Sequence, residues 1–143
     1  MVELVSRDEI LPIRHSVLRP GHPVAAAIYE TDRSPDVFHV AERDGGVVVA
    51  CATLFPEPLD GEPAWRLRGM ATLPGHRGRG IGGRLLDAGV AEIARRGGRL
   101  VWCNGRSAAA AFYLRHGFTI RGEEFDLPPI GPHYRFVRAV APS

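Results

Sequence analysis

Lysine is absent from this chain of 143 residues, and arginine supplies all 18 of its basic side chains. A Walker A loop requires a lysine followed by serine or threonine, so kinase-like or GTPase-like nucleotide chemistry is disfavoured. The chain also lacks any apolar stretch near the roughly 20 residues of a membrane-spanning helix, and no basic segment leads into an apolar run at its start. We therefore expect a cytoplasmic protein with no membrane partner.

Cysteine is scarce: the chain has only Cys51 and Cys103, and both lie in apolar runs typical of strands. Their spacing matches no metal-binding motif, and a chain of this size needs no disulfide to stabilise its core. We expect two buried, reduced thiols and no metal site. Since 45% of the residues are hydrophobic and 24% are charged, the composition is that of an ordinary globular protein, and we expect a single domain over residues 1–143.

Positive charge is concentrated in one segment of the chain. Residues 66–106 contain nine arginines but only two acidic residues, Asp87 and Glu92. Nucleic acid could use such a patch, yet no helix-turn-helix, zinc or aromatic RNA-binding motif accompanies it. A small polyanion is the better match, and we expect no nucleic-acid partner.

The most informative part of this segment is the run Arg-Gly-Arg-Gly-Ile-Gly-Gly at residues 77–83, between a predicted strand and a predicted amphipathic helix. Glycine lacks the Cβ atom that would hold a ligand away from the backbone, and the first turn of a helix has N–H groups without intrahelical partners. These donors and the helix dipole favour an anion, and Arg77, Arg79 and Arg84 add positive charge. We predict a pyrophosphate site here. In the simpler alternative, the glycines form a tight turn and the arginines only solvate it.

The glycine spacing also permits a dinucleotide site, because residues 78–83 satisfy the pattern G-x-G-x-x-G. A Rossmann site would have an acidic residue about 20 positions further on to hold the ribose hydroxyls. Residues 101–106 contain no carboxylate. A nicotinamide-dependent oxidoreductase is therefore the weaker hypothesis.

The remaining pattern predicts a sheet covered by helices. Ser6 and Glu9 fit a capping box before the first helix, where Pro12 should deform an early turn, so that the regular part begins at the proline. Residues 44–46, Asp-Gly-Gly, are a hairpin signal between two strands. We expect helices over residues 6–19, 81–96 and 107–115, a short helix within 22–35, and strands over 37–41, 47–55, 64–72, 100–103, 118–120 and 134–140. This order indicates an α/β or α+β fold.

Two elements of the sequence resemble the GCN5-related N-acetyltransferase (GNAT) family. Residues 77–82 match its central motif, which is Gln or Arg, two residues, Gly, one residue, then Gly or Ala. Residues 112–118 are similar to a later motif in which a tyrosine on a short helix precedes Gly-Phe. The resemblance covers roughly residues 37–140, and it implies a mixed, mostly antiparallel sheet of six to seven strands with helices on both faces.

The resemblance implies an enzyme that transfers an acetyl group from acetyl-CoA directly to the primary amine of a small molecule, with a protein amine as an alternative acceptor. The pyrophosphate would lie on the glycine loop, and the pantetheine arm would lie along the strand that ends at residue 72. A strand edge offers backbone groups in a line that a linear, amide-bearing arm can pair with. The implied cofactor-binding residues are Met70, Ala71, Thr72, Arg77, Gly78, Arg79, Gly80, Ile81, Gly82, Gly83, Asn104 and Tyr113.

Tyr113 is the residue that the resemblance assigns to protonating the departing CoA thiolate. A phenol with an ordinary pKa of about 10 is protonated at neutral pH and can stabilise a developing thiolate. The alternative is that Tyr113 is only a core aromatic. Many family members have an asparagine seven positions before this tyrosine, where this chain has Arg106; we therefore assign the contact with the arm to Asn104, with Arg106 as the alternative.

A general base must also be found, because the attacking amine has to lose a proton. Many relatives place a glutamate on the strand before the central motif, whereas this chain has Arg66 and Arg68 there. His133, in the run Gly-Pro-His-Tyr, has a suitable ordinary pKa and is our candidate catalytic base; it could equally be a structural histidine at a strand start. The other candidates are Glu123, Glu124 and Asp126.

Two further questions stay open at this point. The competing functional class is a non-catalytic acyl-CoA-binding or sensor module that retains the cofactor cleft without a base. The protein could be a monomer or a homodimer, because an exposed edge strand can pair two subunits but nothing requires it.

Overall fold

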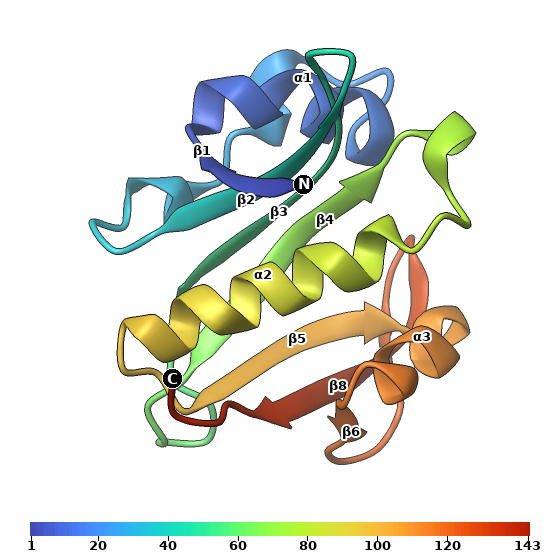
Figure 1. Ribbon diagram of the computed structural model, residues 1–143. Helices are drawn as coiled ribbons and strands as arrows, with labels where there is room; N and C mark the ends of the chain where they lie inside the picture. The colour runs from blue at the N-terminus through green and yellow to red at the C-terminus, as the bar shows by residue number, and fades with distance from the viewer.

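An eight-stranded sheet runs through the computed structural model, which describes residues 1–143 (Figure 1). Its order is β1-β2-β3-β4-β5-β8-β6, with β7 also paired to β8. All pairs are antiparallel except β4 with β5. The strands are β1 (Val2–Val5), β2 (Phe38–Asp44), β3 (Val47–Pro56), β4 (Trp65–Thr72), β5 (Leu100–Arg106), β6 (Thr119–Ile120), β7 (Phe125–Leu127) and β8 (Gly131–Ala139).

This arrangement confirms the expected mixed, mostly antiparallel sheet. The count is eight strands rather than six to seven, because the sequence analysis did not predict β1 and β7. The last strand also begins at Gly131, before the predicted start at Tyr134, so that His133 lies inside it.

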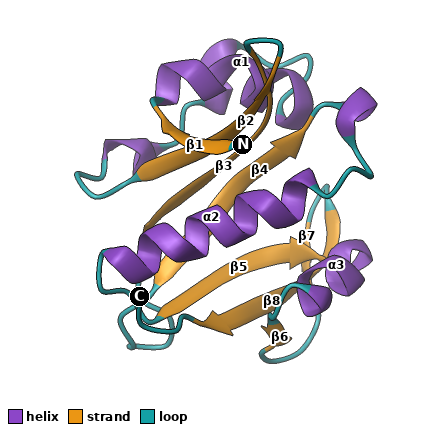
Figure 2. Cartoon of the chain, viewed as in Figure 1, coloured by secondary structure: helices purple, strands orange, loops and turns teal.

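Helices cover both faces of the sheet, as expected (Figure 2). Helix α1 (Arg7–Leu18) lies on one face, and α2 (Ile81–Arg95) lies with the short α3 (Ala110–Arg115) on the other. Four short 3-10 helices connect these elements: η1 (Val24–Ala27), η2 (Glu30–Arg33), η3 (Pro74–His76) and η4 (Ser107–Ala109). None of the helices is long and apolar enough to cross a membrane.

The start of α1 follows the capping box that the sequence predicts. The Ser6 hydroxyl accepts a hydrogen bond from the Glu9 N–H at 3.3 Å, and the Glu9 carboxylate accepts one from the Ser6 N–H at 2.9 Å. The helix is continuous from Arg7 through Pro12, so the expectation that its regular part begins at Pro12 was wrong. The cap satisfies the first N–H groups and stabilises the turn that precedes the proline.

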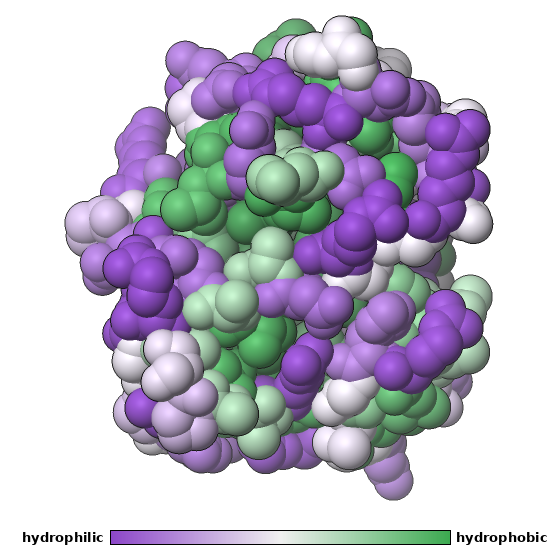
Figure 3. All heavy atoms as spheres, viewed as in Figure 1, coloured by the Kyte–Doolittle hydropathy of each residue, from purple (hydrophilic) through white to green (hydrophobic).

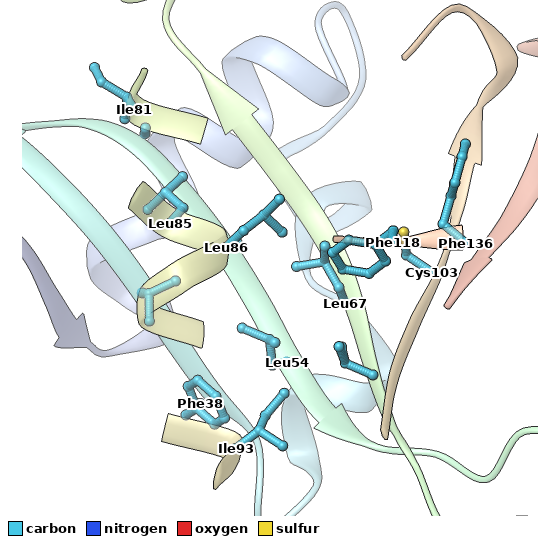
Figure 4. Packing of buried hydrophobic residues seen from close by; sticks show 14 of the residues in the cluster. Phe38, Leu54, Leu67, Ile81, Leu85, Leu86, Ile93, Cys103, Phe118 and Phe136 are labelled. Atoms are coloured by element: carbon cyan, nitrogen blue, oxygen red, sulfur yellow. The ribbon is translucent and has the colours of Figure 1, made fainter. Parts of the chain in front are cut away.

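The largest core lies between α2 and the sheet (Figure 4). Leu85, Leu86 and Ile93 recur on one side of α2 and pack over Leu54 and Leu67 of the sheet, all of them nearly free of solvent. Burying an aliphatic side chain of this size stabilises the fold by about 1.5–3 kcal/mol. On the face of the molecule in Figure 3, hydrophobic patches alternate with hydrophilic residues.

The β2–β3 hairpin turns at two glycines, as the sequence predicts. Asp44 pairs with Val47, and Gly45 and Gly46 have φ angles of 59° and 83°. Two successive positive φ angles are typical of the two-residue turn that matches the twist of the flanking strands.

The two halves of the sheet separate at the junction of β4 and β5. These parallel strands pair only at Trp65 with Val101 and at Arg66 with Trp102. Beyond that point β4 stays paired with β3 as far as Thr72, and β5 stays paired with β8 as far as Arg106. In Figure 1, β5 runs to α3 whereas β4 runs away from it towards the segment before α2, and one edge of β4 is left without a strand partner.

Candidate functional site

A cavity of about 790 Å³ occupies the place where β4 and β5 separate. Its walls come from the second half of β4, the glycine loop with the first turn of α2, the end of β5, and α3 with the start of β8. It contains most of the residues that the sequence analysis selected: Met70, Ala71, Thr72, Arg77, Gly78, Gly80, Ile81, Gly82, Gly83, Asn104, Tyr113 and His133. Arg79 is the exception, since its exposed side chain does not line the cavity.

The glycine loop ends at the N-terminus of α2. Gly78 and Gly80 have φ angles of 79° and 76°, in the left-handed region that favours glycine. Gly80 is the N-cap and provides no side-chain cap, and the first intrahelical bond is the one from the Arg84 N–H to the Gly80 carbonyl at 3.2 Å. The N–H groups of residues 81–83 therefore have no intrahelical partner and lie at the positive end of the helix dipole.

Close packing accounts for the later glycines of the run. A Cβ atom at position 83 would lie 2.5 Å from Cε1 of His116, and one at position 82 would lie 3.1 Å from Cζ of Phe112. Phe112 belongs to α3 and His116 is its C-cap residue, and both line the cavity beside the loop. A side chain at either position would displace these rings, so the glycines leave room for them beside α2.

The arginines near this loop have different partners. Arg77 lines the cavity, and its Nε donates to the Thr72 carbonyl at 3.2 Å. Arg84 instead donates two hydrogen bonds to Glu42, at 2.8 Å and 2.7 Å. These bonds hold the pKa of the Glu42 carboxyl below its usual value. The expectation that Arg84 adds free charge to an anion site was therefore wrong, because its guanidinium is already paired with an acid from β2.

A β-bulge shapes the β4 wall of the cavity. Residues 69 and 70 together face one position of β3, and Gly69 has a φ angle of 65°. A bulge bends its strand and redirects the neighbouring side chains. A Cβ atom at Gly69 would lie 3.1 Å from Cε2 of Tyr29, so glycine also permits the close approach of that ring.

Tyr113 lies between the core and the cavity. Its ring stacks on Phe136 at a centroid distance of 4.5 Å and meets the edge of Phe118 at 5.5 Å. Gly105 makes room for it, since a Cβ atom there would lie 2.6 Å from Cε2 of the tyrosine. Burial raises the pKa of the Tyr113 phenol far above its usual value, with the neighbouring Cys103 thiol acting in the same direction. The phenol is therefore protonated at any ordinary pH and can donate a hydrogen bond into the cavity.

Both cysteines are free and buried, which confirms the expected reduced thiols. Burial raises the pKa of Cys51 to about 11 and that of Cys103 to about 12. The thiolate is the nucleophilic form of cysteine, so neither side chain is suited to accept the acetyl group as a covalent enzyme intermediate.

Asn104 and Arg106 both line the cavity at the end of β5, but their environments differ. The Asn104 Oδ1 atom is buried and has no hydrogen-bond partner within the protein, whereas Arg106 is exposed. A buried amide oxygen without a partner costs free energy, so Asn104 is the residue that gains from an N–H donor inside the cavity.

Of the candidate bases, only His133 lines the cavity. The residue is 5% exposed, and Nδ1 lies 2.8 Å from the Gly131 carbonyl. A carbonyl can only accept, so Nδ1 carries the proton and the neutral ring keeps its lone pair on Nε2. Glu124 instead accepts a hydrogen bond from Ser107 at 2.7 Å, and Glu123 and Asp126 are exposed outside the cavity.

A buried ionic network behind the site was missed by the sequence analysis. Arg14 is fully buried in α1, where it donates to Asp32 at 2.6 Å and 3.1 Å and to the Thr53 hydroxyl at 2.6 Å. Burial alone would raise the pKa of Asp32, but the hydrogen bonds from Arg14 and from the Tyr29 N–H lower it. The available signal was a charged residue at position 14 on the apolar face of a helix, next to Ile13.

Tyr29 joins this network to the cavity. The Arg14 guanidinium lies 4.0 Å from the centre of the Tyr29 ring, and the Arg68 guanidinium lies 4.2 Å from the same centre. Both Tyr29 and Arg68 line the cavity. For Arg68, which has no carboxylate partner, this cation–π contact holds the guanidinium in place.

Comparisons with known proteins agree with this geometry. Residues 34–120 match a family model described as an acetyltransferase (GNAT) domain. The uncharacterized N-acetyltransferase YitI of Bacillus subtilis (strain 168) is 36% identical over 135 residues, which are 92% of this chain and 91% of that protein.

Two solved structures show the same fold at low sequence identity. Escherichia coli ElaA has a TM-score of 0.79 and is 18% identical, with 96% of this chain and 99% of that one covered. An aminoglycoside 6'-N-acetyltransferase complexed with coenzyme A has a TM-score of 0.78 and is 17% identical, with 100% and 98% covered.

Proposed function

Because the chain belongs to the GNAT family of acetyltransferases and is therefore an acyltransferase, we propose that it transfers the acetyl group of acetyl-CoA directly to the primary amine of a small molecule. The observation that carries this proposal is one continuous cavity that joins the free N–H groups of α2 to the Tyr113 phenol and the His133 ring.

The residues of the cavity suit coenzyme A in three places. The glycine loop and Arg77 offer N–H and guanidinium donors to a pyrophosphate. The unpaired edge of β4 at residues 70–72 offers backbone groups to an extended arm, as an added strand would. The buried Oδ1 of Asn104 would accept a hydrogen bond from an amide N–H of that arm.

The chemistry follows from where the proton carriers lie. Bound acetyl-CoA supplies an acetyl group activated as a thioester. Nε2 of His133 accepts a proton from the amine, directly or through a water, and the Tyr113 hydroxyl donates a hydrogen bond to the departing sulfur. Holding the amine and the thioester in one cavity supplies much of the acceleration without a covalent enzyme intermediate.

A second candidate function is an acyl-CoA-binding or sensor module without turnover. It is favoured by one observation: no aspartate or glutamate lines the cavity. Of the bases that the sequence analysis proposed, only His133 is therefore in a position to act. The chemical proposal thus depends on that histidine.

A titration and a thiol assay separate the two functions. Isothermal calorimetry should show that coenzyme A binds, and an Arg77→Gln variant should bind it about tenfold more weakly, the usual cost of one charge-assisted hydrogen bond. Arg99→Gln is the matched control, because Arg99 is exposed and lies outside the cavity. Release of free thiol from acetyl-CoA with a panel of amines then reports turnover.

The outcomes are distinct. Binding with amine-dependent thiol release supports the enzyme, and binding with no release from any amine supports the sensor. If coenzyme A and acetyl-CoA produce no heat under several buffers, both are refuted.

A further inference from the structure

Besides Arg77 of the glycine loop and Arg115 of α3, four arginines line the cavity, and no acidic residue lines it anywhere. Arg66 and Arg68 come from β4, Arg106 from the end of β5, and Arg19 from the C-cap of α1. This charge is separate from the cofactor loop, whose own arginine is Arg77.

The positions along β4 place Arg66 and Arg68 on the side of the sheet that α1 covers. Arg66 and Arg68 alternate in β4 with Leu67, which packs in the core under α2, so the two arginines face the other way. In agreement, the Arg66 guanidinium lies 4.8 Å from the ring of Trp102, which belongs to a separate cluster and not to the core under α2. The glycine loop and Tyr113 belong to the α2 side, so the cavity has a cofactor side and an arginine side.

The positive charge on the arginine side is poorly neutralised. Arg66 forms a salt bridge with Glu57 at 3.2 Å, but Arg19, Arg68 and Arg106 form none. The nearby acid, Asp32, already accepts two hydrogen bonds from Arg14.

Arg68 is the residue most affected by this lack of acids. It is half-buried, and burial lowers the pKa of its guanidinium, as does the charge of Arg66, Arg19 and Arg14, while Tyr29 acts in the opposite direction. A guanidinium that is partly removed from water and surrounded by like charges is stabilised when an anion binds it.

We infer that the acceptor is a small amine that also carries an acidic group, a carboxylate or a phosphate, which binds Arg68 together with Arg19. This inference rests on the proposed acetyl transfer and specifies its substrate class. The forked donors of arginine match either anion, and the amine of the same molecule is left to face the interior of the cavity. A polycationic acceptor, in contrast, would meet like charge on this wall and no carboxylate to pair with.

Matched pairs of amines test the charge preference. β-Alanine against β-alaninamide and O-phosphoethanolamine against ethanolamine each differ mainly in the acidic group, and spermidine and kanamycin represent cations. The free-thiol assay with acetyl-CoA should give a kcat/KM at least about tenfold higher for the acidic member of a pair, the effect of one charge-assisted contact. The pair with the larger ratio identifies carboxylate or phosphate as the preferred anion.

Arginine variants then locate the contact. Arg68→Gln and Arg19→Gln should each raise KM for the acidic amine about tenfold and leave that for its neutral partner within about twofold. Arg33→Gln is the matched control, because Arg33 is exposed, forms no salt bridge and lies outside the cavity. Thermal melting of each variant shows whether it folds.

A binding measurement keeps this inference separable from the proposed function. Thermal shift in the presence of coenzyme A should show stabilisation by the acidic amine that is lost in Arg68→Gln, whether or not turnover occurs. Acid binding without turnover would refute acetyl transfer but retain the anion site. If cationic amines are preferred, or if no acidic amine either binds or reacts better than its neutral partner, the inference is overturned.

Discussion

Replacing Tyr113 by phenylalanine removes one hydroxyl from the cavity and leaves the packing of the ring in place. The aromatic contacts with Phe136 at 4.5 Å and Phe118 at 5.5 Å involve only ring atoms, so the variant should keep them. The hydroxyl has no hydrogen bond to a backbone or charged group in the protein, and its removal should change the free energy of unfolding by less than about 1 kcal/mol.

The effect on catalysis should be much larger. General acid catalysis is worth about 10²–10⁴-fold, so we expect kcat to fall by at least about 100-fold, or about 2.7 kcal/mol in the activation barrier. The dissociation constant of coenzyme A should change by less than about threefold, because the hydroxyl acts on the sulfur only as it departs. The buried phenol also has a raised pKa, so it stays protonated as the pH rises, and no alkaline loss of activity should come from Tyr113 near its usual pKa of about 10.

The assay is steady-state thiol release with the best acceptor, accompanied by calorimetry with coenzyme A. Tyr134→Phe is the matched control, since this tyrosine also packs on Phe136 but does not line the cavity. A fall in kcat of less than threefold in Tyr113→Phe, or an equal fall in the control, would show that Tyr113 is a packing residue and would refute the role proposed for it.

Two further changes test the structure behind the site. Asp32→Asn leaves the Arg14 guanidinium buried without its anion and should destabilise the protein by about 3–5 kcal/mol in urea unfolding, so a loss below 1 kcal/mol would contradict a buried ion pair. The same pair makes stability depend on pH, because the pKa of Asp32 in the folded protein is below the unfolded value of 3.8. Its stabilisation is complete above pH 3.8 and is lost as the pH falls through the folded pKa. In Asp32→Asn, the slope of stability against pH should be flatter in that range. Gly69→Ala places a Cβ atom on a residue with a φ angle of 65°, 3.1 Å from the Tyr29 ring. We expect the free energy of unfolding to fall by about 1–2 kcal/mol and the KM for the acceptor to rise. Unchanged melting and kinetics would show that the bulge tolerates a side chain.

The features that the sequence predicted correctly are encoded by neighbouring residues. The Ser6 cap needs only Glu9, and the hairpin turn needs only the glycines at 45 and 46. The glycine loop is likewise a local signal, because Gly78 and Gly80 have the positive φ angles that glycine favours and α2 begins directly after them. Elements of this kind can be recognised with no knowledge of the rest of the fold.

The features that were missed depend on partners far away in the chain. Residues 125–127 form β7 only because β8 lies beside them, and nothing in so short a segment marks it as a strand. The partner of Arg84 comes from β2, 42 positions earlier in the sequence. Arg14 meets Thr53 across 39 positions, so its burial could not be read from the pattern of its own helix.

The same distant contacts explain why the arginine side of the cavity keeps its charge. Asp32 is held by the buried Arg14 and therefore has no free oxygen to offer to Arg68, although both arginines contact the Tyr29 ring. The absence of a side chain at Gly69 gives the Tyr29 ring room to approach the strand closely. A substitution that released Asp32 from Arg14 would thus do more than weaken the fold: it would allow a carboxylate to neutralise Arg68 from inside the protein. Loss of preference for acidic amines in such a variant, with retained binding of coenzyme A, would connect the buried ion pair directly to acceptor choice.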